Sequence, residues 1–126
     1  MRMPMLKSSD APTFTLDGLT VTGLASPSRG SRETSTWRVV LAPGCSGTQH
    51  SVDREEIFVV LAGTAVATLD DAQIALAAGD TLIVPPHAPF SLANPSAAPC
   101  EAIAIFPVGG RAILPAREPF VPPWAA

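Results

Sequence analysis

Fourteen prolines and nine glycines are spread along this chain of 126 residues instead of being gathered in one tract. Proline lacks a backbone N–H and glycine favours turns, so residues of these two kinds at close intervals interrupt long regular elements. No stretch of the chain sustains a helical period of apolar residues. The spacing therefore predicts many short elements joined by turns, which is typical of an all-β domain.

Apolar or β-branched runs fill the intervals between the turns, and several of them alternate with polar residues. A period of two indicates a strand with one face turned inward. Two short strands joined at Asp17-Gly18 open the series. The remaining predicted strands cover residues 37–41, 56–61, 64–69, 72–77, 81–84, 90–93 and 102–106. We expect a single domain of about ten short strands.

The chain divides into three predicted parts. Residues 1–12 are polar and broken by proline, and we expect them to form a flexible arm. Residues 13–114 form the barrel itself. Residues 115–126 form a proline-rich tail that packs on the barrel, with Phe120 and Trp124 as its anchors.

Composition excludes several classes of function. The net charge is -3, and one lysine and seven arginines are scattered along the chain, so no basic surface for nucleic acid is expected. The first residues lack the apolar core of a signal peptide, and no apolar run is long enough to span a bilayer. Cys45 and Cys100 have neither zinc-finger spacing nor the density of a secreted scaffold. We expect a soluble cytoplasmic protein with reduced thiols and no nucleic acid or membrane partner.

Residues 44–63 are the only stretch in which a histidine, carboxylates and a strand-like apolar run meet. Strand parity places Glu56, Phe58 and Val60 on one face, which we expect to point into the domain toward His50. Ionisable groups in an apolar cavity mark a candidate functional site.

Arg38 and Trp37 fall on opposite faces of the predicted strand at residues 37–41, and the sequence leaves open which face is inward. In one interpretation Trp37 lies in the core and Arg38 lies in water. In the other, Arg38 faces the cavity, where its guanidinium group grips a carboxylate of the ligand.

Two segments within residues 44–94 resemble the paired motifs of the cupin superfamily, whose members are small jelly-roll barrels. The first motif of that family runs from a Gly through five residues to His-x-His, and then to a Glu and a Gly. The residues that match it here are Gly44, His50, Glu56 and Gly63, whereas Val52 replaces the second histidine.

The second cupin motif runs from a Gly through five residues to Pro-x-Gly, and then to a His and an Asn. Gly79, Pro85 and Asn94 match it, His87 stands in place of the second glycine, and Phe90 stands in place of the metal-binding histidine. The resemblance implies an all-β jelly-roll barrel or sandwich with degenerate metal motifs.

In the metal-bearing cupins that the chain resembles, three histidines and one glutamate hold an ion such as iron, manganese or zinc. Only His50 and Glu56 match that set, and two protein ligands make a weak site. His87 is the candidate for a third ligand, although it lies on a predicted turn. We expect no cofactor and no tightly held metal; the alternative is a divalent ion at His50, Glu56 and His87.

Three functions fit this resemblance. In the first, a metal-independent isomerase, epimerase, cyclase or lyase uses His50 and Glu56 as catalytic residues that exchange protons with a small polar organic substrate. In the second, the barrel binds or senses a small molecule without turnover. In the third, a metal-dependent enzyme of the oxygenase type uses His50, Glu56 and His87. In each, the predicted ligand-binding residues are Arg38, Val52, Phe58, His87 and Phe90.

A structural alternative is that His50 and Glu56 only hydrogen-bond each other, as a remnant of a metal site. The protonation of Glu56 bears on this choice. Burial among apolar groups raises the pKa of a carboxyl group, whereas a protonated His50 beside it would lower the pKa. The sequence does not determine whether the pKa of Glu56 is raised or lowered.

A second apolar face lies on the strand that carries Glu56. Ile57, Val59 and Leu61 alternate with the inward residues, so both faces of this strand are apolar. A short barrel offers little cover for its outer face, and we therefore expect a homodimer.

Overall fold

The computed structural model of the protein describes residues 5–126, which form eleven strands and three short 3-10 helices. The strands are β1 (Thr13–Leu16), β2 (Leu19–Ala25), β3 (Thr34–Leu41), β4 (Ser51–Val52), β5 (Glu56–Ala62), β6 (Thr64–Leu69), β7 (Ala72–Ala77), β8 (Thr81–Val84), β9 (Phe90–Ala93), β10 (Cys100–Pro107) and β11 (Ala112–Ile113). The 3-10 helices are η1 (Ser8–Asp10), η2 (Pro27–Arg29) and η3 (Pro123–Ala125). None of these helices is long and apolar enough to cross a membrane.

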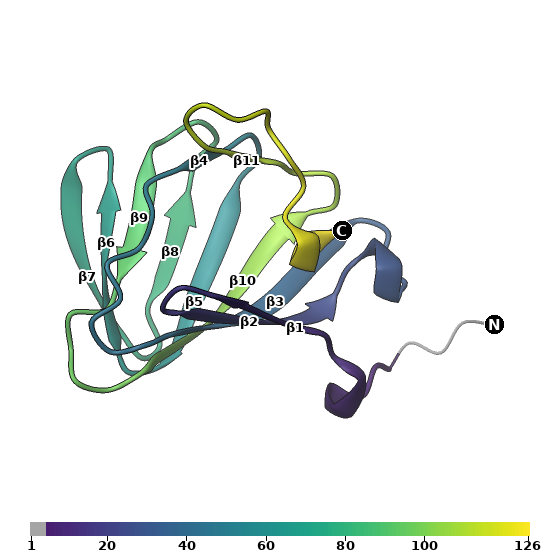
Figure 1. Ribbon diagram of the computed structural model, residues 1–126, viewed down its shortest axis with the longest axis horizontal. Helices are drawn as coiled ribbons and strands as arrows, with labels where there is room; N and C mark the ends of the chain where they lie inside the picture. The colour runs from purple at the N-terminus through teal and green to yellow at the C-terminus, as the bar shows by residue number, and fades with distance from the viewer. Residues whose placement is uncertain (1–4) are drawn as a thin grey trace.

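The strands form two sheets that face each other, and a short third sheet lies across one end (Figure 1). The larger sheet has the order β1-β2-β3-β10-β5-β8, the smaller has the order β7-β6-β9, and β4 pairs with β11. All of these pairs are antiparallel. Strands distant in sequence are neighbours, since β10 lies between β3 and β5. The predicted all-β jelly roll in a single domain is confirmed.

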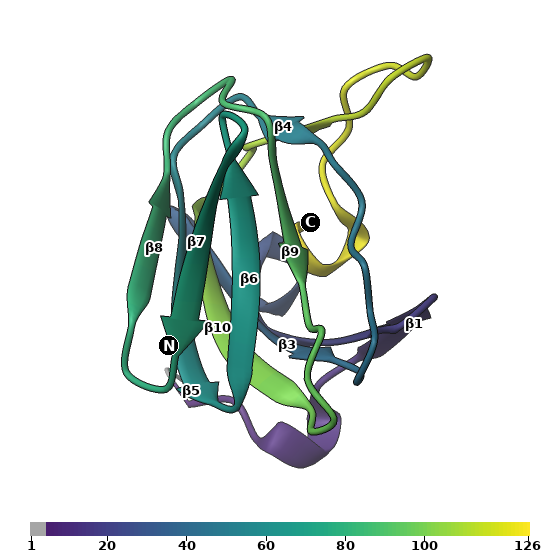
Figure 2. The same ribbon diagram turned by 90° about the vertical axis from the view of Figure 1, so that its left-hand side faces the viewer.

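Figure 2 views the molecule from the side of the smaller sheet, with β6 between β7 and β9. The core lies between the two sheets and is built by alternation along each strand. In β3 the side chains of Trp37, Val39 and Leu41 are buried, and in β10 those of Ala104 and Phe106 are buried. Trp37 stands opposite Ala104 in the ladder, so a small residue makes room for the large ring. Burial of such side chains is the main source of stability in a domain of this size.

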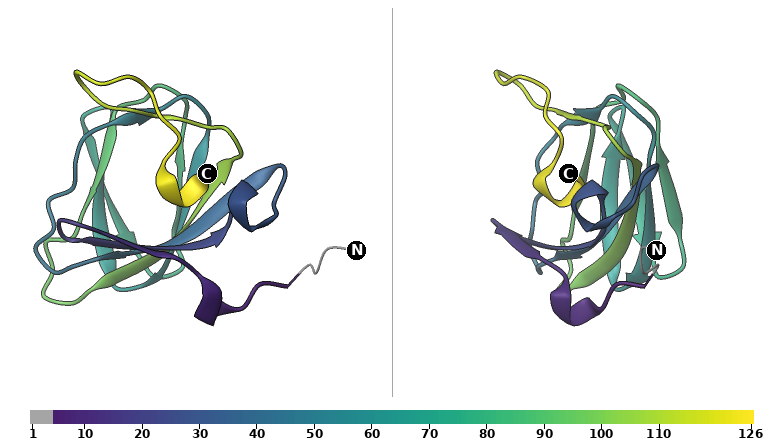
Figure 3. Two further views of the ribbon diagram at one scale, coloured as in Figure 1. Left: turned by 45° about the vertical axis from the view of Figure 1, so that its right-hand side comes forward. Right: turned by 90° about the vertical axis from the view of Figure 1, so that its right-hand side faces the viewer.

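The C-terminal tail turns back to the end of the barrel and completes the core there (Figure 3). The Trp124 ring lies 6.3 Å from that of Trp37 and 5.9 Å from that of Phe14, measured between ring centroids. The Ser35 hydroxyl donates a hydrogen bond of 2.9 Å to the carbonyl oxygen of Ala125. These contacts agree with the interpretation of Trp124 as an anchor.

Two features of the fold differ from the sequence-based expectation. The strands β4 and β11 were not predicted, because two residues are too few to show a period. The predicted arm covers residues 1–12, of which residues 1–4 lie outside the described part of the chain, while residues 8–10 form η1. The division into arm, barrel and tail stays a prediction.

Candidate functional site

His50 lies directly before β4 and is bound to the start of β9. Its backbone N–H donates to the Phe90 carbonyl oxygen at 3.0 Å, and the Phe90 N–H donates to the His50 carbonyl oxygen at 2.8 Å. The two rings are in contact, with 4.4 Å between their centroids. The fold therefore brings the histidine of the first motif beside the phenylalanine of the second.

Glu56 begins β5, and its side chain is buried on the inner face, which it shares with Phe58. The Phe58 ring lies 6.0 Å from the Phe90 ring between centroids, which links this face to His50. Val84 stands opposite Glu56 on β8 and is fully buried, and Val52 is 2% exposed. Glu56 itself is 5% exposed, so its carboxyl group lies among apolar side chains.

The carboxyl group of Glu56 has no hydrogen-bond or ion-pair partner among residues 5–126. Loss of water without a compensating partner disfavours the ionised form, and burial raises the pKa of Glu56 to about 8. Desolvation therefore determines the sign of the pKa shift of Glu56, which the sequence left open. The alternative in which Glu56 and His50 only hydrogen-bond each other is wrong, because the described residues contain no such bond.

The imidazole of His50 is held in one tautomer. Its Nδ1 lies 2.9 Å from the carbonyl oxygen of Thr48. A carbonyl oxygen only accepts, so Nδ1 carries the proton and Nε2 keeps its lone pair. Burial lowers the pKa of His50, and the bond to Thr48 opposes this only in part. Near neutral pH the carboxyl group of Glu56 is therefore mostly protonated, and the imidazole of His50 is mostly neutral.

A cavity of about 520 Å³ opens beside His50. It is lined by Gln49, His50, Ser51, Pro89, Ile113, Leu114 and Pro115. Its volume falls in the range of small-molecule sites, roughly 300–1,000 Å³. Glu56 is not among the residues that line it.

Sequence reasoning missed the wall of this cavity that comes from Ile113, Leu114 and Pro115. These residues reach the site because β11 pairs with β4, with Ile113 opposite Ser51 and Ala112 opposite Val52. No local pattern in the proline-rich tail predicts that pairing. Gln49 and Ser51 could have been found, because they flank His50 directly in sequence.

Of the two orientations that the sequence left open for Arg38, the structure shows the one in which Trp37 lies in the core and Arg38 lies outside it. Trp37 is 4% exposed and points inward, so strand parity turns Arg38 to the outer face of β3. There its Nε lies 3.0 Å from Oε1 of Glu101 on β10, and the two side chains are 40% and 37% exposed. An ion pair this accessible to water contributes little to stability, and it is not part of the cavity.

His87 lies on the turn before β9, and its side chain is exposed. Its backbone N–H donates to the carbonyl oxygen of Val52 at 2.7 Å, and its φ is 68°. This left-handed conformation favours glycine, which explains why the cupin motif has a glycine at this position. His87 therefore contributes its backbone to the site's frame, whereas its side chain does not line the cavity beside His50.

The side chains present do not fit the metal that the motifs imply. Within residues 5–126, no group of three His, Cys, Asp or Glu side chains is arranged to hold an ion, which includes the set of His50, Glu56 and His87. The Phe90 ring is 1% exposed and packs against His50, so carbon fills the space beside the imidazole. We derive no chemistry through a metal at this site.

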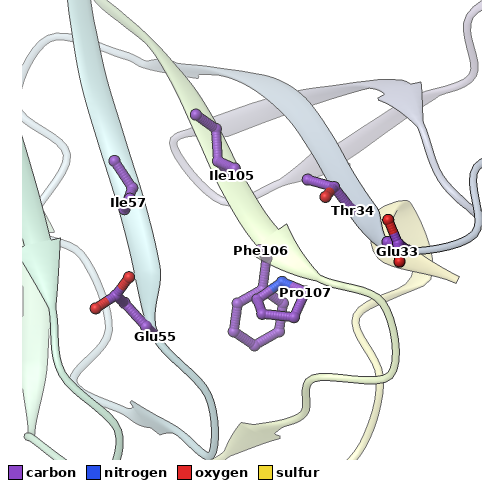
Figure 4. Close-up of a pocket in the computed structure, with 7 residues that line it drawn as sticks. All are labelled: Glu33, Thr34, Glu55, Ile57, Ile105, Phe106 and Pro107. Carbon is purple, nitrogen blue, oxygen red and sulfur yellow. The ribbon is translucent and has the colours of Figure 1, made fainter.

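A second, smaller hollow of about 170 Å³ lies elsewhere in the molecule, on the larger sheet. Figure 4 shows the residues that line it, which are Glu33, Thr34, Glu55, Ile57, Ile105, Phe106 and Pro107. It contains none of the predicted site residues. Its floor is apolar and its rim carries two carboxylates, so it lacks the paired acid and base found at His50 and Glu56.

Comparison with known families gives one sequence match. The family model described as Cupin domain matches residues 37–106, which run from within β3 to the penultimate residue of β10. The chain matches no curated protein sequence.

Several solved structures share the fold. The polyketide cyclase RemF from Streptomyces resistomycificus is similar with a TM-score of 0.79 and 15% identity, over 93% of this chain and 88% of that one. An RmlC-like cupin from Shewanella frigidimarina has a TM-score of 0.72 and 21% identity, over 93% and 95% of the two chains. A sugar phosphate isomerase of the cupin superfamily from Silicibacter pomeroyi has a TM-score of 0.72 and 18% identity, over 90% and 83%. Identities this low show the fold alone.

The buried carboxyl group makes the stability of the protein depend on pH. Its pKa is about 8 in the folded state and near 4.5 when exposed, so between these values the folded protein holds more protons than the unfolded chain. We expect the contribution of Glu56 to the free energy of unfolding to fall as pH rises through this window, by at most about 1.4 kcal/mol per pH unit.

Urea denaturation at several pH values measures this effect by comparing the native protein with Glu56→Gln. The variant keeps the shape of the side chain but cannot ionise. Its free energy of unfolding, measured relative to that of the native protein, should therefore increase from pH 5 to pH 8. A difference that stays constant with pH would show that the carboxyl group is not desolvated.

Proposed function

Since the chain belongs to the cupin superfamily, we propose that its barrel binds a small polar organic molecule and transfers protons to and from it through His50 and Glu56. The observation that carries this proposal is the buried, unpartnered carboxyl group of Glu56. An apolar residue of similar size would avoid the free-energy penalty of burying a carboxyl group. Groups of this kind gather at functional sites, where their shifted pKa suits proton transfer.

The two side chains carry opposite halves of a proton transfer. Glu56 holds a proton near neutral pH and acts as the general acid, and Nε2 of His50 has a free lone pair and acts as the general base. An acid and a base of this kind accelerate a proton-transfer reaction by about 10²–10⁴ each. Isomerisation, cyclisation and elimination of water are reactions of this class, and none consumes a redox equivalent.

The comparisons support this reaction class by analogy only. Two of the proteins with this fold are named as a polyketide cyclase and a sugar phosphate isomerase. Both names describe rearrangements of small organic molecules. Because one fold carries many activities, the proposal depends on the residues of this chain and not on the neighbours.

One observation favours a second candidate, a barrel that binds or senses a small molecule without turnover. Glu56 does not line the cavity beside His50. The Phe90 ring lies 4.4 Å from the His50 ring and 6.0 Å from the Phe58 ring, measured between centroids, and Phe58 shares the inner face of β5 with Glu56. A ligand that stays in the cavity would touch the base without reaching the acid.

We further propose that this chemistry runs without a tightly bound metal, because Val52 and Phe90 replace two expected ligands. Each lost ligand should weaken metal binding by several kcal/mol. Elemental analysis of protein purified without added metal should find far less than one equivalent of zinc, manganese, iron or nickel. A stoichiometric metal that disappears in His50→Ala would contradict the proposal.

The acid-base proposal predicts the behaviour of Glu56→Gln. This variant should keep the fold and bind the substrate, yet lose turnover by at least about 10²-fold, because an amide cannot exchange the proton. His50→Ala should do the same. Glu55→Gln is the matched control, because Glu55 precedes β5 and is exposed.

The readout is turnover and ligand binding measured on the same preparations, with circular dichroism to confirm the fold. Full turnover in Glu56→Gln would end the acid-base proposal. Binding without turnover in the native protein, for every ligand that the barrel holds, would establish the non-catalytic alternative.

We also propose that the protein is a cytoplasmic homodimer. Cys45 and Cys100 are both free thiols, as expected in a reducing compartment. The outer face of β5 and β8 is apolar, with Ile57 opposite Ile83 in the ladder. Ile83 is 55% exposed and Leu61 is 49% exposed, so the outer face lacks cover within one chain.

Light scattering on dilute protein tests the dimer. The native protein should have twice the mass of one chain, and Ile83→Asp should shift it toward the monomer because a charge would be buried at the interface. Gln73→Asp, on the exposed face of β7 in the other sheet, should leave the mass unchanged. A native protein that is monomeric would refute the proposed interface.

A further inference from the structure

The cavity beside His50 is held open by backbone pairing on two sides. On one side His50 is bonded to Phe90, and on the other Ser51 pairs with Ile113. The backbones of Phe120 and Ala112 are joined by two hydrogen bonds, which hold the C-terminal tail next to β11. The walls are therefore parts of the folded frame, and the cavity exists before any ligand binds.

Most of the lining of this cavity is apolar. Pro89 lies on the side of Phe90, and Ile113, Leu114 and Pro115 form the wall from the tail. Proline rings and branched side chains present rigid surfaces with few hydrogen-bonding groups. Such surfaces fit an apolar ligand surface better than a hydrated one.

None of the described lysine and arginine side chains lines the cavity beside His50. Arg38 pairs with Glu101, and the Nε of Arg111 lies 3.3 Å from Oδ2 of Asp53. Arg29 donates to the carbonyl oxygen of Gly23 at 2.6 Å, and the guanidinium group of Arg117 lies 3.7 Å above the Phe120 ring centroid. The other described cations, which also do not line the cavity, are Lys7, Arg32 and Arg54.

The polar groups that do line the cavity are formally uncharged. They are the Gln49 amide, the Ser51 hydroxyl and the His50 ring, whose Nδ1–H is already used by Thr48. An anionic ligand entering here would lose water without gaining a counter-ion, which opposes its binding. The free Nε2 of His50 accepts a hydrogen bond, so the matching group on a ligand is a donor.

We propose that the cavity beside His50 takes an uncharged organic molecule that has an apolar body and a hydroxyl group that donates to Nε2 of His50. This proposal narrows the substrate class of the proposed function to neutral alcohols with an apolar body. It rests on the proposed function only because both use the cavity beside His50. Molecules that carry a phosphate or a carboxylate are excluded as ligands.

Three probes of one shape separate the charge states. They are 2-naphthol, which is uncharged at neutral pH, 2-naphthoate, which is an anion, and 2-naphthylmethylammonium, which is a cation. Chemical-shift titration by NMR gives the affinity of each and shows whether the amides of His50 and Leu114 respond. We expect 2-naphthol to bind there and both charged probes to bind at least about tenfold more weakly, a difference of about 1.4 kcal/mol.

Two variants test whether the lack of a cation in the cavity is what weakens the binding of the anionic probe. Leu114→Arg puts a guanidinium group on the wall, and Leu114→Gln puts a neutral side chain there. The naphthoate should gain affinity in the first and not in the second, because only the first supplies a counter-ion. Equal gains in both variants would show that size, and not charge, decides binding.

The proposal is overturned if either charged probe binds the native protein as tightly as 2-naphthol, or if no probe binds at the cavity. Tight binding of the ammonium probe would show that the cavity accepts a cation, which the proposal rules out. The binding measurements test the charge preference, and the turnover of Glu56→Gln tests the acid-base function. The charge preference can therefore fail while loss of turnover in Glu56→Gln still supports the acid-base function.

Discussion

Strand parity on β5 is the constraint from which the site follows. Phe58 and Val60 must point inward to build the core, and this orientation turns Glu56 inward as well. Burial of the two apolar side chains stabilises the fold by about 1.5–3 kcal/mol each. Holding the Glu56 carboxyl group neutral at pH 7 costs about 3 kcal/mol, given its pKa of about 8. The core therefore outweighs the penalty, and the acid is retained inside the barrel.

The degenerate motifs acquire a physical meaning in this frame. In place of a second and third imidazole, Val52 and Phe90 surround the two remaining polar side chains with carbon. Phe90 packs against the His50 ring, and burial moves the pKa of Glu56 up and that of His50 down. In our proposal, the residues that replace the metal ligands also provide the apolar lining in which His50 and Glu56 act as base and acid.

Much of the fold could be predicted because it depends on alternation. Turns at proline and glycine delimit the strands, and the period of two identifies Trp37 and Glu56 as residues on defined faces. The elements that escaped prediction, β4 and β11, are held by pairing between distant segments. They carry the wall of the cavity, which is why the sequence located His50 but not Ile113 or Leu114.

Two further features required the three-dimensional structure. Alternation alone could not choose the inward face of β3, and Arg38 is turned outward because the bulky Trp37 fills the space opposite Ala104. The sign of the pKa shift of Glu56 depends on all its neighbours at once. A cation beside the carboxyl group would lower its pKa, and only the three-dimensional contacts show whether one is there. Neither property is local in sequence.

The protonation of Glu56 can be measured directly. A carbon-13 NMR titration follows the side-chain carboxyl carbon of Glu56, which is assigned by its disappearance in Glu56→Gln. The buried, unpartnered state predicts a midpoint near pH 8. A midpoint near the ordinary value of 4.5 would show that the carboxyl group is solvated or paired, and would contradict the acid-base account of this barrel.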